Sequence, residues 1–147
     1  MGSKIKEEAI RNLIRIEAPD IFLLQETKME DSNFLQISKK LWNKSKATVV
    51  SSRGASGGLG TLWNDSRFSL VSEISNNHWP MLKMQHLVTK ETFCLFNVYV
   101  SINAGEKKAC WDSIRSQADM GNLDNVIIAG DLNLTLHSSE KQGGCIV

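Results

Sequence analysis

The chain has 147 residues, of which 41% are hydrophobic, and its formal net charge is +1, with 17 Lys and Arg against 16 Asp and Glu. A chain of this length is expected to form one domain that buries roughly 70% of the surface exposed when it is unfolded. The balanced charge excludes a strong global attraction to nucleic acid or anionic membranes, so any phosphate binding has to come from local groups.

The cysteines and the hydropathy pattern indicate a soluble intracellular protein. The three cysteines, Cys94, Cys110 and Cys145, are odd in number and far apart. No CxxC pair occurs, which argues against a disulfide framework or a zinc knuckle and fits a reducing compartment. The sequence shows no signal peptide, and no apolar stretch approaches the roughly 18 residues of a membrane span. We therefore expect no contact with a membrane and a location in the nucleus or cytoplasm.

The opening segment is predicted to be a helix followed at once by a strand. Apolar residues recur at helical spacing from Ile5 to Ile14, and Pro19 ends the helix. The apolar run Ile21–Leu24 then predicts a short buried strand. That strand ends two residues before Glu26, so a carboxylate is placed where the strand leaves the sheet.

A second helix is predicted after residue 30. Asp31 or Ser32 can cap its N-terminus, because short polar side chains accept hydrogen bonds from the first free amides of a helix. Its apolar residues are expected to pack: Phe34, Ile37, Leu41 and Trp42.

From residue 47 to residue 99 the pattern changes to short strands. The segments are ATVVSS, GTLW, FSLVSEI, MLKMQHLV and TFCLFNVYV, separated by polar, turn-like groups. Turns about every 8 to 12 residues predict an antiparallel meander that forms half of a sandwich rather than a Rossmann sheet. A third helix is expected from about Glu106 to Ala118.

The segment VIIAGDLN, residues 126–133, combines a predicted buried strand with polar groups at its end. Gly130 lets the backbone bend, and Asp131 and Asn133 follow at the mouth of the sheet. Glu26 and Asp131 thus each follow an apolar strand, and two such strands could pool their ligands at one edge. Hard oxygen ligands of this kind suit Mg²⁺. The alternative is that the first segment merely ends a strand and the second merely forms a turn.

Other candidate motifs are not supported. The glycine-rich residues 52–60 lack the Gly-Lys-Ser/Thr ending of a P-loop and lead into a strand, so they are expected to form a hairpin or surface loop. Arg53 in this loop could contact a backbone phosphate or be solvated. His78, His86 and His137 have no metal-ligand spacing, and no serine lies in a GxSxG elbow.

Four segments carry a family resemblance: PDIFLLQETK, GGLGTLW, FNVYVSIN and IIAGDLN. In this order and at these separations they resemble the endonuclease/exonuclease/phosphatase superfamily, above all the apurinic-type endonuclease domain of plant LINE-type (non-LTR) retrotransposons. The resemblance implies a four-layered α/β sandwich of the DNase I-like type, with two mixed, mostly antiparallel sheets between flanking helices. It also implies hydrolysis of phosphate esters, DNA among them, with Mg²⁺ or Mn²⁺.

The resemblance assigns roles to individual residues. Glu26 falls on the metal-binding glutamate, and Tyr99 falls on the tyrosine that contacts phosphate. Asp131 would orient or deprotonate the attacking water, while Asn133 would hold a nonbridging oxygen. Two further residues are candidates for contact with substrate phosphate: Arg53 and Asn103.

The sequence also departs from the family pattern. The family has a strand with an active-site asparagine before the first helix, and it closes with strands that carry an aspartate and an Asp-His pair. Residues 1–147 are therefore expected to form a single partial domain with little or no turnover alone. An uncovered sheet would favour self-association or a protein partner. The alternative is a domesticated, non-catalytic protein that binds protein or nucleic acid.

Overall fold

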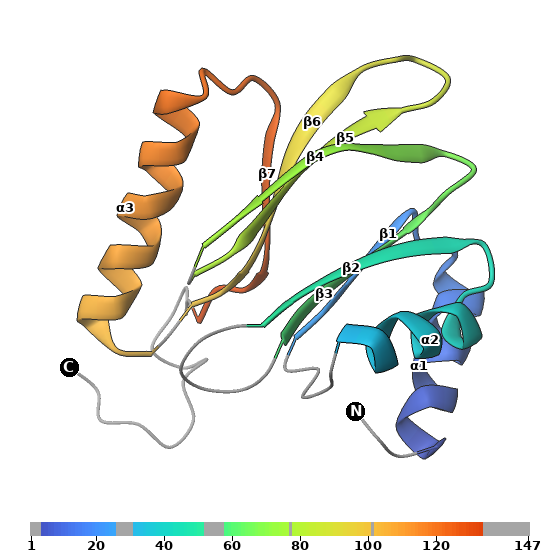
Figure 1. Ribbon diagram of the computed structural model, residues 1–147. Coiled ribbons are helices and arrows are strands. Elements are labelled where there is room, and N and C mark those ends of the chain that lie inside the picture. Colours follow the sequence, from blue (N-terminus) through green and yellow to red (C-terminus); the bar gives the residue numbers. More distant parts are fainter. Residues whose placement is uncertain (1–3, 26–30, 52–57, 77, 101, 134–147) are drawn as a thin grey trace.

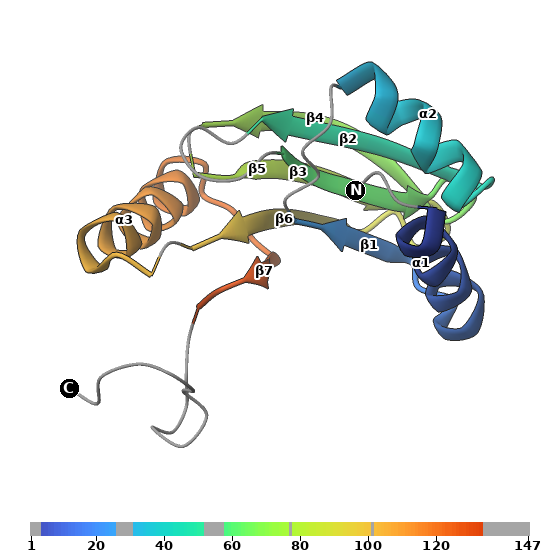
Figure 2. The same cartoon turned by 90° about the horizontal axis from the view of Figure 1, so that it is seen from below.

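The computed structural model describes residues 4–25, 31–51, 58–76, 78–100 and 102–133. Two sheets pack face to face, with α1 and α2 beside the first sheet and α3 against the outer face of the second, which makes the predicted four layers (Figures 1 and 2). The elements are α1 (Lys4–Glu17), β1 (Ile21–Leu24), α2 (Asp31–Leu41), β2 (Ser45–Ser51), β3 (Gly58–Asn64), β4 (Phe68–Ser75), β5 (Pro80–His86), β6 (Thr92–Tyr99), α3 (Ala104–Met120) and β7 (Val126–Asp131).

The strands between residues 45 and 99 belong to two sheets, so the prediction of one continuous meander was wrong. The first sheet has the order β1-β3-β2 and the second has the order β4-β5-β6-β7. All neighbours are antiparallel except β6 and β7, which are parallel. The turn at Asp65 to Arg67 leads the chain from the first sheet to the second. At its start Asp65 N donates to Lys44 O beside β2, and at its end Arg67 O accepts from Leu87 N beside β5. The alternation of apolar and polar residues along two strands does not reveal whether the turn between them stays in one sheet or leads to another.

Apolar side chains fill two layers of the interior. Between the two sheets, Trp63 of β3 packs in a cluster with Phe68, Leu82 and Met84. The opposite faces of β5 and β6 pack against α3, with these buried residues: Trp79, Met81, Cys94, Phe96, Val98, Val100, Cys110 and Ile114. The second sheet is therefore covered on both faces over β5 and β6.

The glycine-rich segment has a packing role at the point where it enters β3. A Cβ at Gly60 would lie 2.4 Å from the ring of Phe34, so α2 approaches the sheet as closely as only glycine allows. Residues 52–57, including Arg53, lie outside the described residues.

Two burial predictions were wrong. The strand β7 was predicted to be buried, but Val126, Ile127 and Ile128 are 38%, 47% and 36% exposed, because β7 is the edge strand of its sheet. The strand β1 was also predicted to be buried, but all four of its residues, Ile21 to Leu24, are only partly buried. None of the described helices combines the length and the apolar character that would let it cross a bilayer.

Candidate functional site

The parallel pair β6 and β7 brings two of the predicted site residues together. Tyr99 at the end of β6 is the register partner of Asp131 at the end of β7. The pairing continues past the strands, because Val100 N donates to Asp131 O at 2.8 Å. Carboxyl ends of parallel strands meet at one edge of a sheet, so the phenol and the carboxylate share that edge.

Asn133 joins the same edge through a tight turn. It has a positive φ of 45°, a conformation that asparagine adopts more readily than most residues. Its backbone N–H donates to Asp131 Oδ1 at 3.1 Å. The side-chain amide of Asn133 donates to Val100 O, and Lys107 Nζ of α3 donates to Asn133 O at 2.9 Å. The GDLN turn is therefore anchored to both β6 and α3.

The carboxylate of Asp131 is free to interact with a ligand. Its side chain is exposed, and within the described ranges it forms no ion pair with a lysine or arginine. The backbone N–H of Asn133 holds one carboxylate oxygen of Asp131 in place but does not neutralise the negative charge of that carboxylate. An oriented, unpaired carboxylate can hold a hard cation or accept a proton from water.

Gly130 allows the close approach of the strands just before Asp131. Its φ is +126°, and a Cβ there would lie 2.1 Å from Val98 O and 3.0 Å from Gln25 Nε2. The first distance shows that β7 lies too close to β6 for any other residue. The second shows that the end of β1 also reaches this place, so three strands from two sheets converge here.

A buried polar network holds the end of β1 against β6. Gln25 Nε2 donates to Asn97 Oδ1 at 2.6 Å. Asn97 is 0% exposed, and its amide group donates to Gly60 O at 3.1 Å and to Thr61 Oγ1 at 3.2 Å. One asparagine therefore ties β6 of the second sheet to β1 and β3 of the first. Glu26 follows Gln25 in the chain but lies outside the described residues.

The two candidates for contact with substrate phosphate differ in what the structure shows. Asn103 is the N-cap of α3: its Oδ1 accepts from Gly105 N at 3.0 Å and from Glu106 N at 3.1 Å. This cap starts the helix that carries Lys107 to Asn133. Arg53 belongs to the residues that the structure does not describe.

Three residues that support the site were not among the predicted site residues: Gln25, Asn97 and Lys107. Asn97 had a detectable signal, because it is the one amide inside the apolar run TFCLFNVYV, and a polar residue in a buried strand needs partners. Lys107 had none, since a lysine near the start of a helix is ordinary.

The surroundings of His86, Cys94 and Cys110 are those of residues that stabilise the fold. His86 packs edge-on against Phe68 with ring centroids 5.2 Å apart, and its Nδ1 accepts from Val88 N at 3.3 Å. Burial raises the pKa of the Cys94 thiol, although Lys83 partly opposes this, and burial also raises the pKa of the Cys110 thiol. Both cysteines are free and buried, as expected of packing residues rather than nucleophiles. Cys145 and His137 lie outside the described residues.

The described side chains at the edge where β6 and β7 end supply part of the ligand set that a hard divalent cation needs. Asp131 supplies carboxylate oxygens, the ligand type that Mg²⁺ prefers, and such sites commonly hold Mg²⁺ with one or two carboxylates plus waters and substrate phosphate. Among the described residues, no group of three or more His, Cys, Asp or Glu side chains forms a complete cage. The predicted ligand Glu26 is not among those residues.

Solved structures of low sequence identity share this fold. The catalytic domain of human Nocturnin, with bound sulfate, superimposes with a TM-score of 0.70 at 15% identity, over 90% of this chain and 58% of that chain. A Bacteroides thetaiotaomicron endonuclease/exonuclease/phosphatase family protein gives a TM-score of 0.73 at 16% identity, over 92% and 58%. D. rerio TDP2 in complex with a single-strand DNA product gives 0.69 at 16% identity, over 88% and 54%.

The chain thus spans less than two thirds of the length of these structures. A search of curated proteins found no significant match. The sequence model of the endonuclease/exonuclease/phosphatase family matches residues 2–146. That match covers nearly the whole chain, and the mixed sheets with flanking helices agree with it, so this chain belongs to the endonuclease/exonuclease/phosphatase family.

Proposed function

We propose that this chain is part of a divalent-metal-dependent phosphodiesterase that nicks DNA, derived from the endonuclease of a plant LINE-type retrotransposon. The observation that carries the proposal is the meeting of Tyr99, Asp131 and Asn133 at one edge, with the end of β1 beside them. Family membership supports the reaction type. The DNA product bound to D. rerio TDP2 supports DNA as the substrate.

Each site residue has a role in this proposal. Glu26, together with substrate oxygens and water, holds Mg²⁺ or Mn²⁺, which when bound polarises the scissile phosphate and stabilises the leaving oxygen. Asp131 orients or deprotonates the attacking water, since its carboxylate is exposed and unpaired within the described chain. Tyr99 and Asn133 hold nonbridging phosphate oxygens, and the contact from Lys107 to Asn133 keeps the turn in place.

We further propose that residues 1–147 alone turn over DNA slowly. The solved structures that share the fold are longer, and the chain covers 58% or less of the three compared above. The loss of one preorganised contact to the transition state typically costs about 10²- to 10³-fold in rate, and groups that act as a unit fail together. Full activity then needs groups from outside this sequence.

The proposal is tested by nicking of supercoiled plasmid with Mg²⁺ and with EDTA. The chain is assayed alone and mixed with a polypeptide that supplies the first strand and the C-terminal half of a retrotransposon endonuclease domain. We expect faint activity alone, stimulation by the added polypeptide, and a loss of about 10³-fold or more in Asp131→Ala. Asp112→Ala is the matched control, because it removes an exposed carboxylate of α3 that, in the part of the chain the structure describes, pairs with Lys108 and no other cation.

The outcomes separate the parts of the proposal. Equal nicking by Asp131→Ala and Asp112→Ala would exclude the assigned site. Full activity of the unsupplemented chain would show that no outside groups are needed. Metal-dependent nicking that disappears with Asp131→Ala would exclude a purely non-catalytic protein.

One observation favours that non-catalytic alternative as a second candidate. The outer edge of β7 exposes Val126, Ile127 and Ile128, and a hollow of about 430 Å³ lies beside it, lined in part by Phe93 and Asn125. An unpaired strand edge with apolar side chains can pair with another chain. In this second candidate, a domesticated protein binds a protein partner or a second copy of itself through β7.

A further inference from the structure

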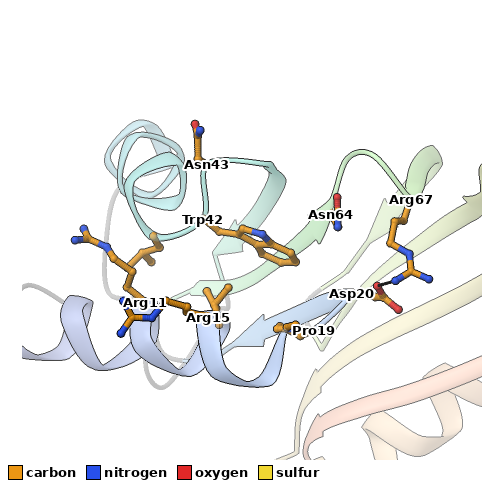
Figure 3. Close-up of a pocket in the computed structure, with 11 residues that line it drawn as sticks. Arg11, Arg15, Pro19, Asp20, Trp42, Asn43, Asn64 and Arg67 are labelled. Carbon is orange, nitrogen blue, oxygen red and sulfur yellow. Dashed lines mark ion pairs between the residues drawn. The ribbon is translucent and has the colours of Figure 1, made fainter.

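A second cavity lies at the opposite end of the first sheet from the candidate site. Asp20, the residue before β1, lines it, β1 ends at the candidate site, and the antiparallel β3 ends at the cavity with Asn64. The cavity has a volume of about 390 Å³ and lies between the C-terminal ends of α1 and α2 and the turn after β3 (Figure 3). This volume falls within the range of roughly 300–1,000 Å³ that is common for small-molecule sites.

The wall of the cavity offers a flat aromatic surface. Trp42 follows α2 and is half-buried, and Figure 3 shows its indole between Arg15 on one side and Asn64 on the other, above Pro19. Ile14 and Leu41 form an apolar floor. Trp42 was predicted to be a packing residue, and the structure shows that part of it also lines this opening. An indole with an accessible part can stack on a nucleobase.

The same cavity carries uncompensated positive charge. Arg11 and Arg15 lie one turn apart on α1. Arg15 donates to the neutral amide oxygen of Asn12 at 3.0 Å, and Arg11 has no hydrogen bond or ion pair within the described part of the chain. The third arginine, Arg67, is paired with Asp20 at 2.9 Å. The acidic residues of α1 do not line the cavity: Glu7, Glu8 and Glu17.

The two arginines favour an anion and oppose the partial negative charge that the C-terminal ends of α1 and α2 place beside the cavity. Like charges one turn apart on a helix repel each other, so a group that binds both Arg11 and Arg15 removes an unfavourable interaction as well as forming a favourable one. Guanidinium groups bind phosphate oxygens with paired N–H donors. The chain has a formal net charge of only +1, so Arg11 and Arg15 form a local cluster of positive charge rather than part of a general basic surface.

We propose that the cavity binds a nucleotide unit, with its phosphate on Arg11 and Arg15 and its base against Trp42. The ligand is a free nucleoside monophosphate or one nucleotide of a single strand, since both present a phosphate next to an aromatic base. This site lies at the far end of β1 from Asp131, so it does not depend on the function proposed above.

Equilibrium dialysis with radiolabelled AMP, in EDTA so that no metal contributes, tests the site. We expect a dissociation constant of about 1 mM or lower. The double variant Arg11→Gln/Arg15→Gln should weaken binding about tenfold or more, because glutamine keeps the helix propensity but loses the charge. The matched control is Arg115→Gln, an exposed arginine on α3, and it should bind AMP like the wild type.

Further probes distinguish contacts with the base from contacts with the phosphate, and a free nucleotide from a nucleotide of a single strand. Trp42→Leu should weaken binding of AMP without changing binding of inorganic phosphate. A dA pentanucleotide that binds more tightly than AMP, and loses this in the double arginine variant, identifies a single strand as the source; equal affinity identifies the free nucleotide. No binding of AMP up to about 10 mM, or equal losses in the Arg11→Gln/Arg15→Gln and Arg115→Gln variants, would overturn the proposal.

Discussion

Gly130→Ala is expected to lower the free energy of unfolding by about 3–5 kcal/mol, a large part of the roughly 5–15 kcal/mol that stabilises a typical domain. The backbone φ of +126° disfavours any side chain, and the added Cβ would lie 2.1 Å from Val98 O. Val98 is 0% exposed and is the register partner of Gly130, so neither strand can move aside without breaking the pairing of β6 and β7. Urea unfolding measures the change.

A matched control isolates the cause of the Gly130 effect. Gly105→Ala adds the same methyl group in α3, where the nearest atom is Asn103 Oδ1 at 3.3 Å, and it should change stability by at most about 1 kcal/mol. Hydrogen exchange should also show that Gly130→Ala loses protection at the amides of β7 first. Similar stabilities for the two variants would show that β6 and β7 are not packed as described.

Asn97→Leu is expected to destabilise the protein by about 3 kcal/mol or more. The leucine fills a similar space but leaves three buried groups without their partner: Gln25 Nε2, Gly60 O and Thr61 Oγ1. Each such group costs about 1–3 kcal/mol when it loses its hydrogen bond. The comparison is Gln85→Leu, which removes one hydrogen bond to Lys90 O in an exposed turn and should cost no more than about 1 kcal/mol.

A second substitution at the same position tests the burial of the network through pH. In Asn97→Asp the carboxylate would face Gly60 O in a site that is 0% exposed, so its pKa in the folded state should rise above that in the unfolded chain. A raised folded pKa means that the variant is most stable below the unfolded pKa, about 4, and loses stability as the pH rises through the folded pKa. Unfolding curves that show no such loss would contradict the burial of Asn97.

Most of the fold could be predicted because its signals are local. Pro19 marks the end of α1, the run Ile21–Leu24 forms β1, and the GDLN segment follows a strand. The distribution of strands between sheets could not be predicted, because the turn at Asp65 to Arg67 has the composition of a hairpin turn although it joins two sheets. The exposure of Val126 to Ile128 was also hidden, since an edge strand and a central strand can share one apolar pattern.

The candidate site could be predicted only where a residue follows the end of its own strand. Asp131 ends β7 and Asn133 follows it, and the structure brings both to the edge where Tyr99 ends β6. An amide in the apolar run of β6 signals that Asn97 needs partners, but those partners come from strands distant in sequence, so no local pattern identifies them. The same reason hid the arginine-lined cavity, whose side chains come from α1, the end of α2 and the turn after β3.

We propose that β1, β6 and β7 end in one divalent-metal site. The most direct test is a titration of the isotopically labelled chain with Mn²⁺, in which the paramagnetic ion broadens amide signals near its binding place. We predict selective broadening at Gln25, Val100, Asp131 and Asn133 that Mg²⁺ reverses by competition and that Asp131→Asn abolishes. Broadening confined to other parts of the molecule, or unchanged in Asp131→Asn, would exclude a metal site where these three strands end.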